Sequence, residues 1–479
     1  LMIPKLYDGR NKTFWFMNYE RDKVNQLDFN GFTTLSPVAY RNGDFSQMLD
    51  KTWSGQSQAG STVGTDAAGR AVVFGSIYDP KSTRVGPGGA VLRDAFPGNK
   101  IPTARFDPVA AAVLKVGLAD PTYSSMIRNI AQLSSGQPYF NSTIWMFKVD
   151  QIITSKHRAS FFFNHGERQR NNIGGGRYLP VPGLPTSGWQ DQHTPSQMGR
   201  FNITSTVTPT LINNFTLGYN RFLNANGAPL ETVNQDWANK IGIKNTAATV
   251  FPLFTFGGAD YQGGTIAKIG VGWYGAGANG SKVLKDDATK IMGKHTFHFG
   301  YQYTEYFYNE QNYSDSGSYA FRNTETSLPG FSTQTGNAFA SFLLGAAHNA
   351  SHSIAGLSSG FRGPYHAMWF SDDIKLTPKL TLNVGLRWEV ITPFFERTNR
   401  MSYIDLSQKD PTAGNRPGLL TFKNRPTSTY FGQLGPRLGV AYQVNDKMVV
   451  RMGYAMMNTP PLTNNWGYGG FTTGYNAGI

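Results

Sequence analysis

The sequence lacks cysteine altogether, and it also lacks any run of about eighteen or more apolar residues. Without cysteine the chain has no disulfide bond and no thiolate metal site. A helical membrane span needs about 20 consecutive apolar residues, and the mean hydropathy is only -0.36, so helical spans are excluded as well. Lipid permits one other architecture, the closed β-barrel, in which every backbone group is paired.

Charged residues are scarce too, at 15%, whereas aromatic residues reach 14% and glycine contributes 54 of the 479 residues. The chain is too long for one ordinary soluble domain and long enough for a large barrel. Its net charge of +14 would suit nucleic acid, but the basic residues form no run and no nucleic-acid motif. We therefore expect no nucleic-acid partner. The scattered Lys and Arg are predicted to meet lipopolysaccharide phosphates or anionic solutes.

The segment Tyr365–Arg397 carries the clearest structural pattern in the chain. After Pro378, apolar and polar residues alternate, which places the two sets on opposite faces of a β-strand. The apolar set is Leu380, Leu382, Val384, Leu386 and Trp388, and the other set is Thr381, Asn383, Gly385, Arg387 and Glu389. Upstream, the apolar set is Met368, Phe370, Ile374 and Leu376, with Asp372 as its one exception. The short link Thr377-Pro378-Lys379 predicts an antiparallel hairpin.

Both strands of this hairpin are predicted to run about ten residues or more, whereas strands of soluble proteins usually stop at about five or six. Crossing a bilayer takes roughly 9–11 tilted residues. One face is apolar and the other carries Asn383, Arg387 and Glu389, as in a transmembrane barrel with lipid outside and a polar lumen inside. A sandwich strand with one solvated face gives the same pattern, so this hairpin alone leaves both folds open.

Further strands show the same alternation and are joined in pairs by short turns. They are predicted at Ile144–Ile153 with Arg158–Arg168, Arg200–Thr208 with Leu211–Phe222, Lys282–Met292 with Thr296–Tyr308, and Gln433–Val444 with Met448–Met457, after a first strand at Thr13–Glu20. Long connections separate the pairs, at residues 166–199, 223–281 and 392–432. Such loops would be unusual in a compact soluble domain. The predicted fold class is therefore all-β: an antiparallel up-and-down transmembrane β-barrel with long extracellular loops.

The longest connection, residues 21–141, is predicted as an irregular extracellular loop region rich in Gly, Ser and Pro. Within it, Phe106–Val116 is predicted as a short helix. Asp107 is its expected N-cap, and Pro108 takes the first helical position, where its missing N–H costs nothing.

Asn337–Leu344 is predicted as a short helix in a periplasmic turn, flanked by weaker strands near Ser318–Thr335 and Ser351–Leu357. With these, the chain has about thirteen strands, an odd number where bacterial single-chain barrels are even, so at least one strand is expected to be missing. The chain starts LMIPKLYDGR, without a signal-peptide pattern, which we interpret as a processed or partial chain.

Several segments, spread over nearly the whole chain, resemble TonB-dependent receptors of the Oar-like type. The matching segments are IPKLYDGRNKTFWFMNYE at 3–20, DAFPGNKIPTARFDPVA at 94–110, GKHTFHFGYQY at 293–303, NAFASFLLG at 337–345, FSDDIKLTPKLTLNVGLRWE at 370–389 and GPRLGVAYQVNDKMVVRMGY at 435–454. They occur in the order of that family, and the last two are the most specific.

The resemblance implies an outer-membrane barrel of about 22 strands, closed by an N-terminal plug and preceded by a carboxypeptidase-regulatory-like β-sandwich. It also implies ligand uptake energised by the inner-membrane TonB complex. Residues 1–479 would then be a partial receptor barrel, without the plug, the regulatory-like domain or a TonB-contacting segment before Leu1, and ending at Ile479 inside a loop.

No residue pattern predicts catalysis, so we expect no enzyme activity, no catalytic residue, no metal site and no cofactor. His295 and His298 are spaced like half a metal site, but on a strand they fall on opposite faces. His348 and His352 lie in a stretch rich in Ser and Ala, with no acidic partner nearby.

Adjacent carboxylates also diverge on a strand, so Asp286-Asp287 and Asp372-Asp373 are predicted as solvated rim residues rather than acid/base pairs. The glycine-rich runs Gly174-Gly175-Gly176 and Gly86-Pro87-Gly88-Gly89 lack the Lys-Ser or Lys-Thr that follows in a phosphate-binding loop. They are predicted as flexible loops.

Aromatic residues in the loops allow an interpretation as sugar-stacking side chains; examples are Trp273, Tyr274, Trp466 and Tyr468. Aromatic girdles and packed loops explain them equally well, so the ligand-binding residues stay unassigned.

The predicted function is an outer-membrane receptor barrel for TonB-energised uptake of an unidentified ligand, such as a carbohydrate or a siderophore-like molecule. The alternative is a surface-exposed adhesion or structural barrel without transport. Expected partners are outer-membrane lipid, lipopolysaccharide, the TonB complex through the N-terminal plug region, and a small-molecule or oligosaccharide ligand. A plug and a TonB-contacting segment upstream of Leu1 in the full gene would favour the receptor.

Overall fold

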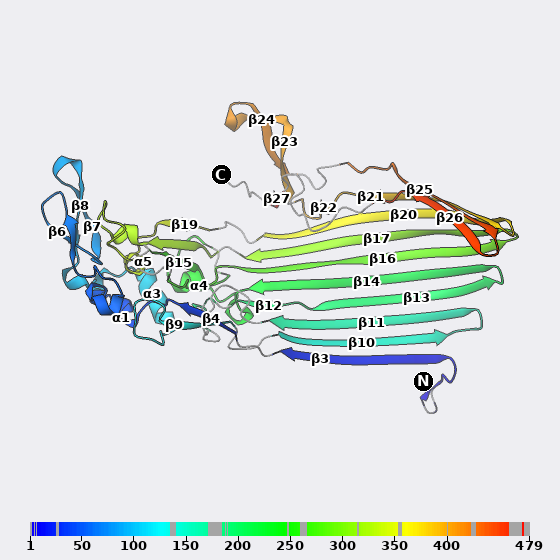
Figure 1. The fold of residues 1–479 in the computed structure, drawn as a ribbon, viewed down its shortest axis with the longest axis horizontal. Helices are drawn as coiled ribbons and strands as arrows, with labels where there is room; N and C mark the ends of the chain where they lie inside the picture. Colours follow the sequence, from blue (N-terminus) through cyan, green and yellow to red (C-terminus); the bar gives the residue numbers. More distant parts are fainter. Residues whose placement is uncertain are drawn as a thin grey trace.

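One long antiparallel sheet dominates the structure, and the loops gather at one end of it (Figure 1). The computed structural model describes residues 2–3, 5, 7–24, 28–134, 140–170, 184–186, 188, 190–246, 249–258, 266–313, 316–352, 357–399, 401–422, 428–458 and 472–473. The sheet has 13 strands: β3 (Thr13–Val24), β10 (Phe140–Ile152), β11 (His157–Arg170), β12 (Asp191–His193), β13 (Ser196–Thr208), β14 (Leu211–Gly227), β16 (Tyr274–Met292), β17 (His295–Tyr313), β20 (Leu357–Thr377), β21 (Leu380–Ile391), β22 (Phe395–Glu396), β25 (Gln433–Asn445) and β26 (Met448–Ala455).

The strands follow one another across the sheet in chain order, from β3 at one edge to β26 at the other. Each long strand pairs antiparallel with its neighbours, so the predicted up-and-down architecture is confirmed. The predicted hairpins β10–β11, β13–β14, β16–β17, β20–β21 and β25–β26 are all present, and their short turns lie together at the end of the sheet away from the loops (Figure 1).

The strands are longer than a bilayer requires. β16 and β17 have 19 residues each, and a strand of that length measures about 65 Å at about 3.4 Å per residue. The hydrocarbon core of a bilayer is about 30 Å thick. The loop-side parts of these strands therefore extend beyond the membrane.

The β20–β21 hairpin separates its two sets of side chains as the sequence predicts. Phe370 lies opposite Leu386 on one face, and Trp369 lies opposite Arg387 on the other. On the apolar face, Val384 is 45% exposed and Leu386 is 49% exposed. Apolar side chains this exposed are typical of the lipid-facing surface of a barrel, so we expect this face to meet lipid.

Asp372, the one acidic residue on the apolar face of β20, is hydrogen-bonded rather than free. Its carboxylate accepts a hydrogen bond of 2.6 Å from the Nδ1 atom of His295 on β17. The side chain of Asp372 is buried. The other carboxylate oxygen, Oδ1, is buried and has no hydrogen-bond partner among the described residues, so the imidazole offsets only part of the cost of placing a carboxylate on this face.

The prediction of a weaker barrel strand near Ser318–Thr335 is wrong, and most of the strand predicted near Ser351–Leu357 lies outside the described residues. Ser318–Arg322 forms β18, which belongs to a separate three-stranded sheet with β15 (Leu253–Gly257) and β19 (Asn349–Ser351). β12 and β22 complete the thirteen strands of the large sheet instead. An alternating pattern reveals a strand but does not reveal which sheet the strand joins.

Two predicted helices are confirmed, but one lies elsewhere than expected. α3 (Pro108–Val116) has Asp107 as its N-cap, and the Asp107 carboxylate accepts hydrogen bonds from two backbone N–H groups of the first turn. α5 (Ala338–Leu343) lies at the loop end of the sheet, not in a periplasmic turn (Figure 1). All six of its residues are buried, and only the loops offer enough apolar surface to cover them.

The connections that follow β3, β14 and β17 fold into one unit, called here the loop module and defined as residues 28–134, 228–258, 266–271 and 316–352 (Figure 1). They share one hydrophobic core, whose largest buried members include Tyr40, Phe45, Met48, Phe251, Phe254, Phe256, Phe321, Phe339, Phe342 and Leu343. Residues 28–134 of the expected irregular region 21–141 are thus an ordered part of a domain-like unit, whereas residues 21–24 belong to β3 and residues 140–141 to β10.

Short elements make up the loop module around α3, α5, β15, β18 and β19. They are β4 (Asp28–Thr33), α1 (Val38–Arg41), α2 (Lys51–Ser54), β5 (Thr62–Thr65), β6 (Ala71–Val73), β7 (Tyr78–Val85), β8 (Val91–Ala95), β9 (Ile130–Ser134) and α4 (Trp237–Lys240). Outside the module, β1 (Met2–Ile3) pairs with β2 (Tyr7–Asp8), and β23 (Met401–Asp410) pairs with β24 (Arg416–Phe422) and β27 (Thr472–Thr473). The β23–β24 hairpin projects away from the sheet (Figure 1).

Candidate functional site

The polar face of the sheet carries a charged aromatic cluster at mid-length. Trp369 on β20 lies between two cations: the Lys285 Nζ atom is 5.5 Å and the Arg387 Cζ atom 5.1 Å from the centre of its ring. Arg437 on β25 lines the same cavity, which has a volume of about 420 Å³. The register of the strands places all these side chains on one face. The cluster favours anions or electron-rich groups.

Arg387, which lines this cavity, also belongs to a hydrogen-bonded network. Its Nε atom donates to the Glu389 carboxylate at 2.8 Å, and its second guanidinium nitrogen donates to the Tyr365 hydroxyl at 2.9 Å. The Tyr365 hydroxyl donates to the same carboxylate at 2.5 Å. Because the three groups satisfy one another, they fix the direction of Arg387 more than they offer a site for a ligand.

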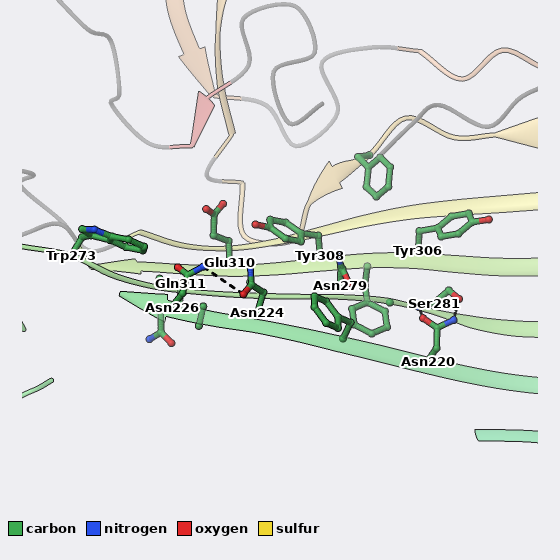
Figure 2. A pocket seen from close by; sticks show the side chains of 17 residues that line it. Asn220, Asn224, Asn226, Trp273, Asn279, Ser281, Tyr306, Tyr308, Glu310 and Gln311 are labelled. Atoms are coloured by element: carbon green, nitrogen blue, oxygen red, sulfur yellow. Dashed lines mark hydrogen bonds between the residues drawn. The ribbon is translucent and has the colours of Figure 1, made fainter. Parts of the chain in front are cut away.

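A second and larger cavity, with a volume of about 620 Å³, lies on the same face near the loop end of β14, β16 and β17. Its wall consists mainly of amide, hydroxyl and aromatic side chains (Figure 2). The labelled members are Asn220, Asn224, Asn226, Trp273, Asn279, Ser281, Tyr306, Tyr308, Glu310 and Gln311. We call this cavity the amide groove.

The amide groove follows from strand periodicity. Asn220, Asn224 and Asn226 have the same parity on β14, so they project from one face. Across the ladder, Asn220 lies opposite Ser281 and Asn224 lies opposite Gly277 on β16. The residues on this part of β16 are small, whereas the side chains on the neighbouring strands β14 and β17 are long. This difference in size creates the amide groove.

The histidine and carboxylate pairs diverge as predicted, but the prediction of solvated rim residues is wrong for Asp372, which is buried. His295 bonds Asp372 on the outer face, whereas the Nδ1 atom of His298 lies 3.0 Å from the Thr289 hydroxyl on the inner face. Asp286 accepts a hydrogen bond from Asn213 at 2.7 Å. Asp287 faces the other way and pairs with Lys285 at 2.7 Å.

The prediction that His348 has no acidic partner is wrong, because its Nδ1 atom lies 2.9 Å from the carboxylate of Glu325. The loop module brings these residues together although 23 positions separate them in the chain. His352, by contrast, is an exposed residue next to β19.

The glycine-rich runs and the aromatic residues that the sequence singled out lie in three different places. Gly86-Pro87-Gly88-Gly89 forms the tip of the β7–β8 hairpin. Gly174-Gly175-Gly176, Trp466 and Tyr468 lie outside the described residues. Trp273 lines the amide groove, and Tyr274 begins β16.

Sequence reasoning missed most of the amide groove. It ended the strand at Phe222 and assigned residues 223–281 to a connection, whereas β14 continues to Gly227 and β16 begins at Tyr274. Asn220, Asn224 and Asn226 are separated by even numbers of positions, as side chains on one face of a strand are. This parity is the signal that could have extended β14.

Within the part of the chain that the structure describes, no three His, Asp or Glu side chains gather to hold a metal ion. No helix among these residues is long and apolar enough to cross a membrane. Nothing in the described residues shows catalysis.

Over residues 3–478 the sequence matches the outer membrane beta barrel domain, so the chain belongs to that family. It is therefore an outer-membrane protein, and its apolar face meets the lipid while its polar face lines the lumen. No curated protein matches the chain.

Solved structures that match part of the chain include outer-membrane receptors and transporters. One is the ferripyoverdine receptor of Pseudomonas aeruginosa, with 13% identity over 66% of this chain and 35% of that chain, and a TM-score of 0.36. Another is the transporter YddB from Escherichia coli, with 10% identity over 67% and 40% and a TM-score of 0.35. A third is the ferric citrate transporter FecA, with 11% identity over 66% and 36% and a TM-score of 0.34. The match spans 35% to 40% of the length of these structures.

Proposed function

We propose that this chain forms part of the wall of a TonB-dependent uptake receptor of the Oar-like type. The observation that carries the proposal is the lumen face, with a cationic cavity around Trp369 and the amide groove nearer the loops. A barrel that only anchors a surface domain has no need for open polar cavities at two depths along its interior. A barrel that passes a solute inward does need them.

The loop module belongs on the outer surface in this proposal, because long loops of such barrels face outward and short turns face the periplasm. Among the strands that the structure describes, β3 and β26 each pair with a neighbour on one side only. Since lipid tolerates no open sheet edge, further strands complete the wall to about 22. Partners are then outer-membrane lipid, lipopolysaccharide and, through a plug region, the TonB complex.

A surface adhesion or structural barrel is the second candidate. The compact loop module favours it, because a domain-like unit at the barrel mouth offers a large surface to another cell or matrix. The two functions differ in whether energy from the inner membrane is required.

The test compares cells that carry or lack the full-length gene, each with and without TonB. For a receptor, the gene increases growth on at least one scarce carbon or iron source, and the increase disappears without TonB. For an adhesion barrel, surface attachment changes and growth does not, whether TonB is present or absent. The second result would refute the uptake proposal.

A further inference from the structure

We infer that the amide groove binds a neutral oligosaccharide on the lumen wall. This inference rests on the proposed uptake function and names the substrate class. The groove lies on β14, β16 and β17 at the loop end of the barrel, where an incoming solute first meets the wall (Figure 2). Its volume of about 620 Å³ lies within the range of about 300–1,000 Å³ that small-molecule sites occupy.

The charge of the groove is nearly neutral. No Lys, Arg or His is present among its described lining residues, and Glu310 is the one ionisable acid among them. In the amide groove, an anionic metal chelate would be repelled by the Glu310 carboxylate, and no cation among the described lining residues would compensate for this repulsion. The mid-length cavity with Lys285, Arg387 and Arg437 is the part of the wall that suits anions.

The polar groups match hydroxyl groups. Each Asn offers one acceptor and two donors, and a sugar hydroxyl both donates and accepts. Some of these groups are already engaged: Asn220 donates to Ser281 Oγ at 2.8 Å, and the Asn224 carbonyl accepts from Gln192 at 2.8 Å. Such internal bonds hold the amides in fixed directions.

Two polar side chains remain open toward the groove. Within the described part of the chain, the side chains of Asn279 and Glu310 have no hydrogen-bond partner. Asn279 is exposed and Glu310 is partly exposed, so both side chains are accessible to a ligand in the groove. Figure 2 shows Glu310 directed into the open space of the groove.

Aromatic rings supply the apolar part of the site. A Cβ atom at Gly277 would lie 3.0 Å from the hydroxyl oxygen and 3.2 Å from a ring carbon of Tyr308. Glycine at this position therefore lets the Tyr308 ring rest against the backbone of β16. The Tyr308 ring also stacks on Phe361, with ring centroids 6.5 Å apart, so the ring that can stack on the C–H face of a sugar is that of Trp273 at the end of the groove. Amide hydrogen bonds beside such stacking are the combination that a neutral saccharide requires.

The experiment uses the full-length receptor purified in detergent and isothermal titration calorimetry. The probes are maltohexaose, xylohexaose and cellohexaose, with ferric citrate as an anionic comparison and trilysine as a cationic one. We expect at least one hexasaccharide to bind saturably. Asn279→Ala should raise its Kd about five-fold, the effect of one lost neutral hydrogen bond. The matched control Asn214→Ala changes the same residue type on the lumen face of β14, outside the groove, and should leave Kd unchanged.

The outcomes separate the inference from the proposed function. If ferric citrate binds and no hexasaccharide does, the saccharide assignment is wrong while an uptake receptor stands. If trilysine binds and Glu310→Gln abolishes its binding, the groove is a cation site and the assignment is again wrong. If a hexasaccharide binds equally to the wild type and Asn279→Ala, its site lies elsewhere. Growth that is independent of TonB would instead refute the proposed function.

Discussion

The side-chain amide of Asn383 donates a hydrogen bond to the carboxylate of Asp373, directly across the β20–β21 hairpin on the lumen face. The next residue, Val384, points the other way and is 45% exposed to the lipid side. Asn383 therefore faces the lumen and its neighbour Val384 faces lipid. Replacing each of them by Arg tests this assignment of the two faces.

Val384→Arg should reduce assembly, whereas Asn383→Arg should assemble nearly as well as the wild type. An Arg that faces lipid costs about 2–4 kcal/mol at the bilayer midplane and about 0–1 kcal/mol near the interfaces. In the lumen, the guanidinium introduced by Asn383→Arg can pair with the Asp373 carboxylate. Assembly is measured as the heat-modifiable fraction of the full-length protein in isolated outer membranes. Equal assembly of the two variants would show that Val384 does not face lipid.

Gly300→Ala should also impair assembly, by about 1–3 kcal/mol of overpacking. A Cβ at this position would lie 2.5 Å from the Trp369 ring and 2.6 Å from the backbone oxygen of Asp286. The backbone atom cannot move away without disturbing the ladder. The control is Gly453→Ala on β26, where the nearest atom is 3.6 Å away. The same gel assay applies, and normal assembly of Gly300→Ala would contradict the packing around Trp369.

Phe342→Ala should loosen the loop module and leave the barrel intact. Phe342 is fully buried and contacts the rings of Phe254, Phe256 and Phe321. Truncating such a ring typically costs about 3–5 kcal/mol. We expect faster proteolysis within residues 28–134 and unchanged heat-modifiability. Val85→Ala, at a position 80% exposed, is the control. If both variants are cleaved at the same rate, the connections do not share a core.

The stability of the loop module should fall below about pH 4, the ordinary range of an Asp. Hydrogen bonds from Arg84 and then Arg70 lower the pKa of Asp94 to about 2. Because the unfolded chain takes up this proton at higher pH than the folded one, the stabilisation is present above about pH 4 and is lost as pH falls toward 2. Asp94 is half exposed, so its ion pairs contribute only about 0.2–1 kcal/mol each.

Hydrogen exchange of β7 and β8 at pH 6 and pH 3 measures this effect. Exchange protection should fall between these values in the wild type and fall less in Asp94→Asn, which has already lost the pairs. Asp410→Asn changes an acid outside the loop module and should behave as the wild type does. If Asp94→Asn loses as much exchange protection between pH 6 and pH 3 as the wild type does, groups other than Asp94 control the acid sensitivity.

Sequence patterns predicted the hairpins because alternation and a short turn are local properties. They missed the loop ends of β14 and β16, where Gly275, Ala276 and Gly277 replace the apolar residues that make alternation visible. They also missed the contact of His348 with Glu325, since it depends on the folding of the loop module. The amide groove was therefore missed although every strand that forms it was recognised in part, and the parity of Asn220, Asn224 and Asn226 was its one visible signal.

The core of the loop module joins Tyr40 to Leu343, residues that lie about 300 positions apart, and contacts so distant in the chain form slowly. Each hairpin of the sheet, in contrast, closes between neighbouring segments. We therefore expect an order of events during biogenesis: the strands from β3 to β17 pair while the connections at their loop end are still unstructured. The loop module can complete its core only after α5 has been delivered to it, so the loop end of the sheet becomes ordered after the strands that carry it.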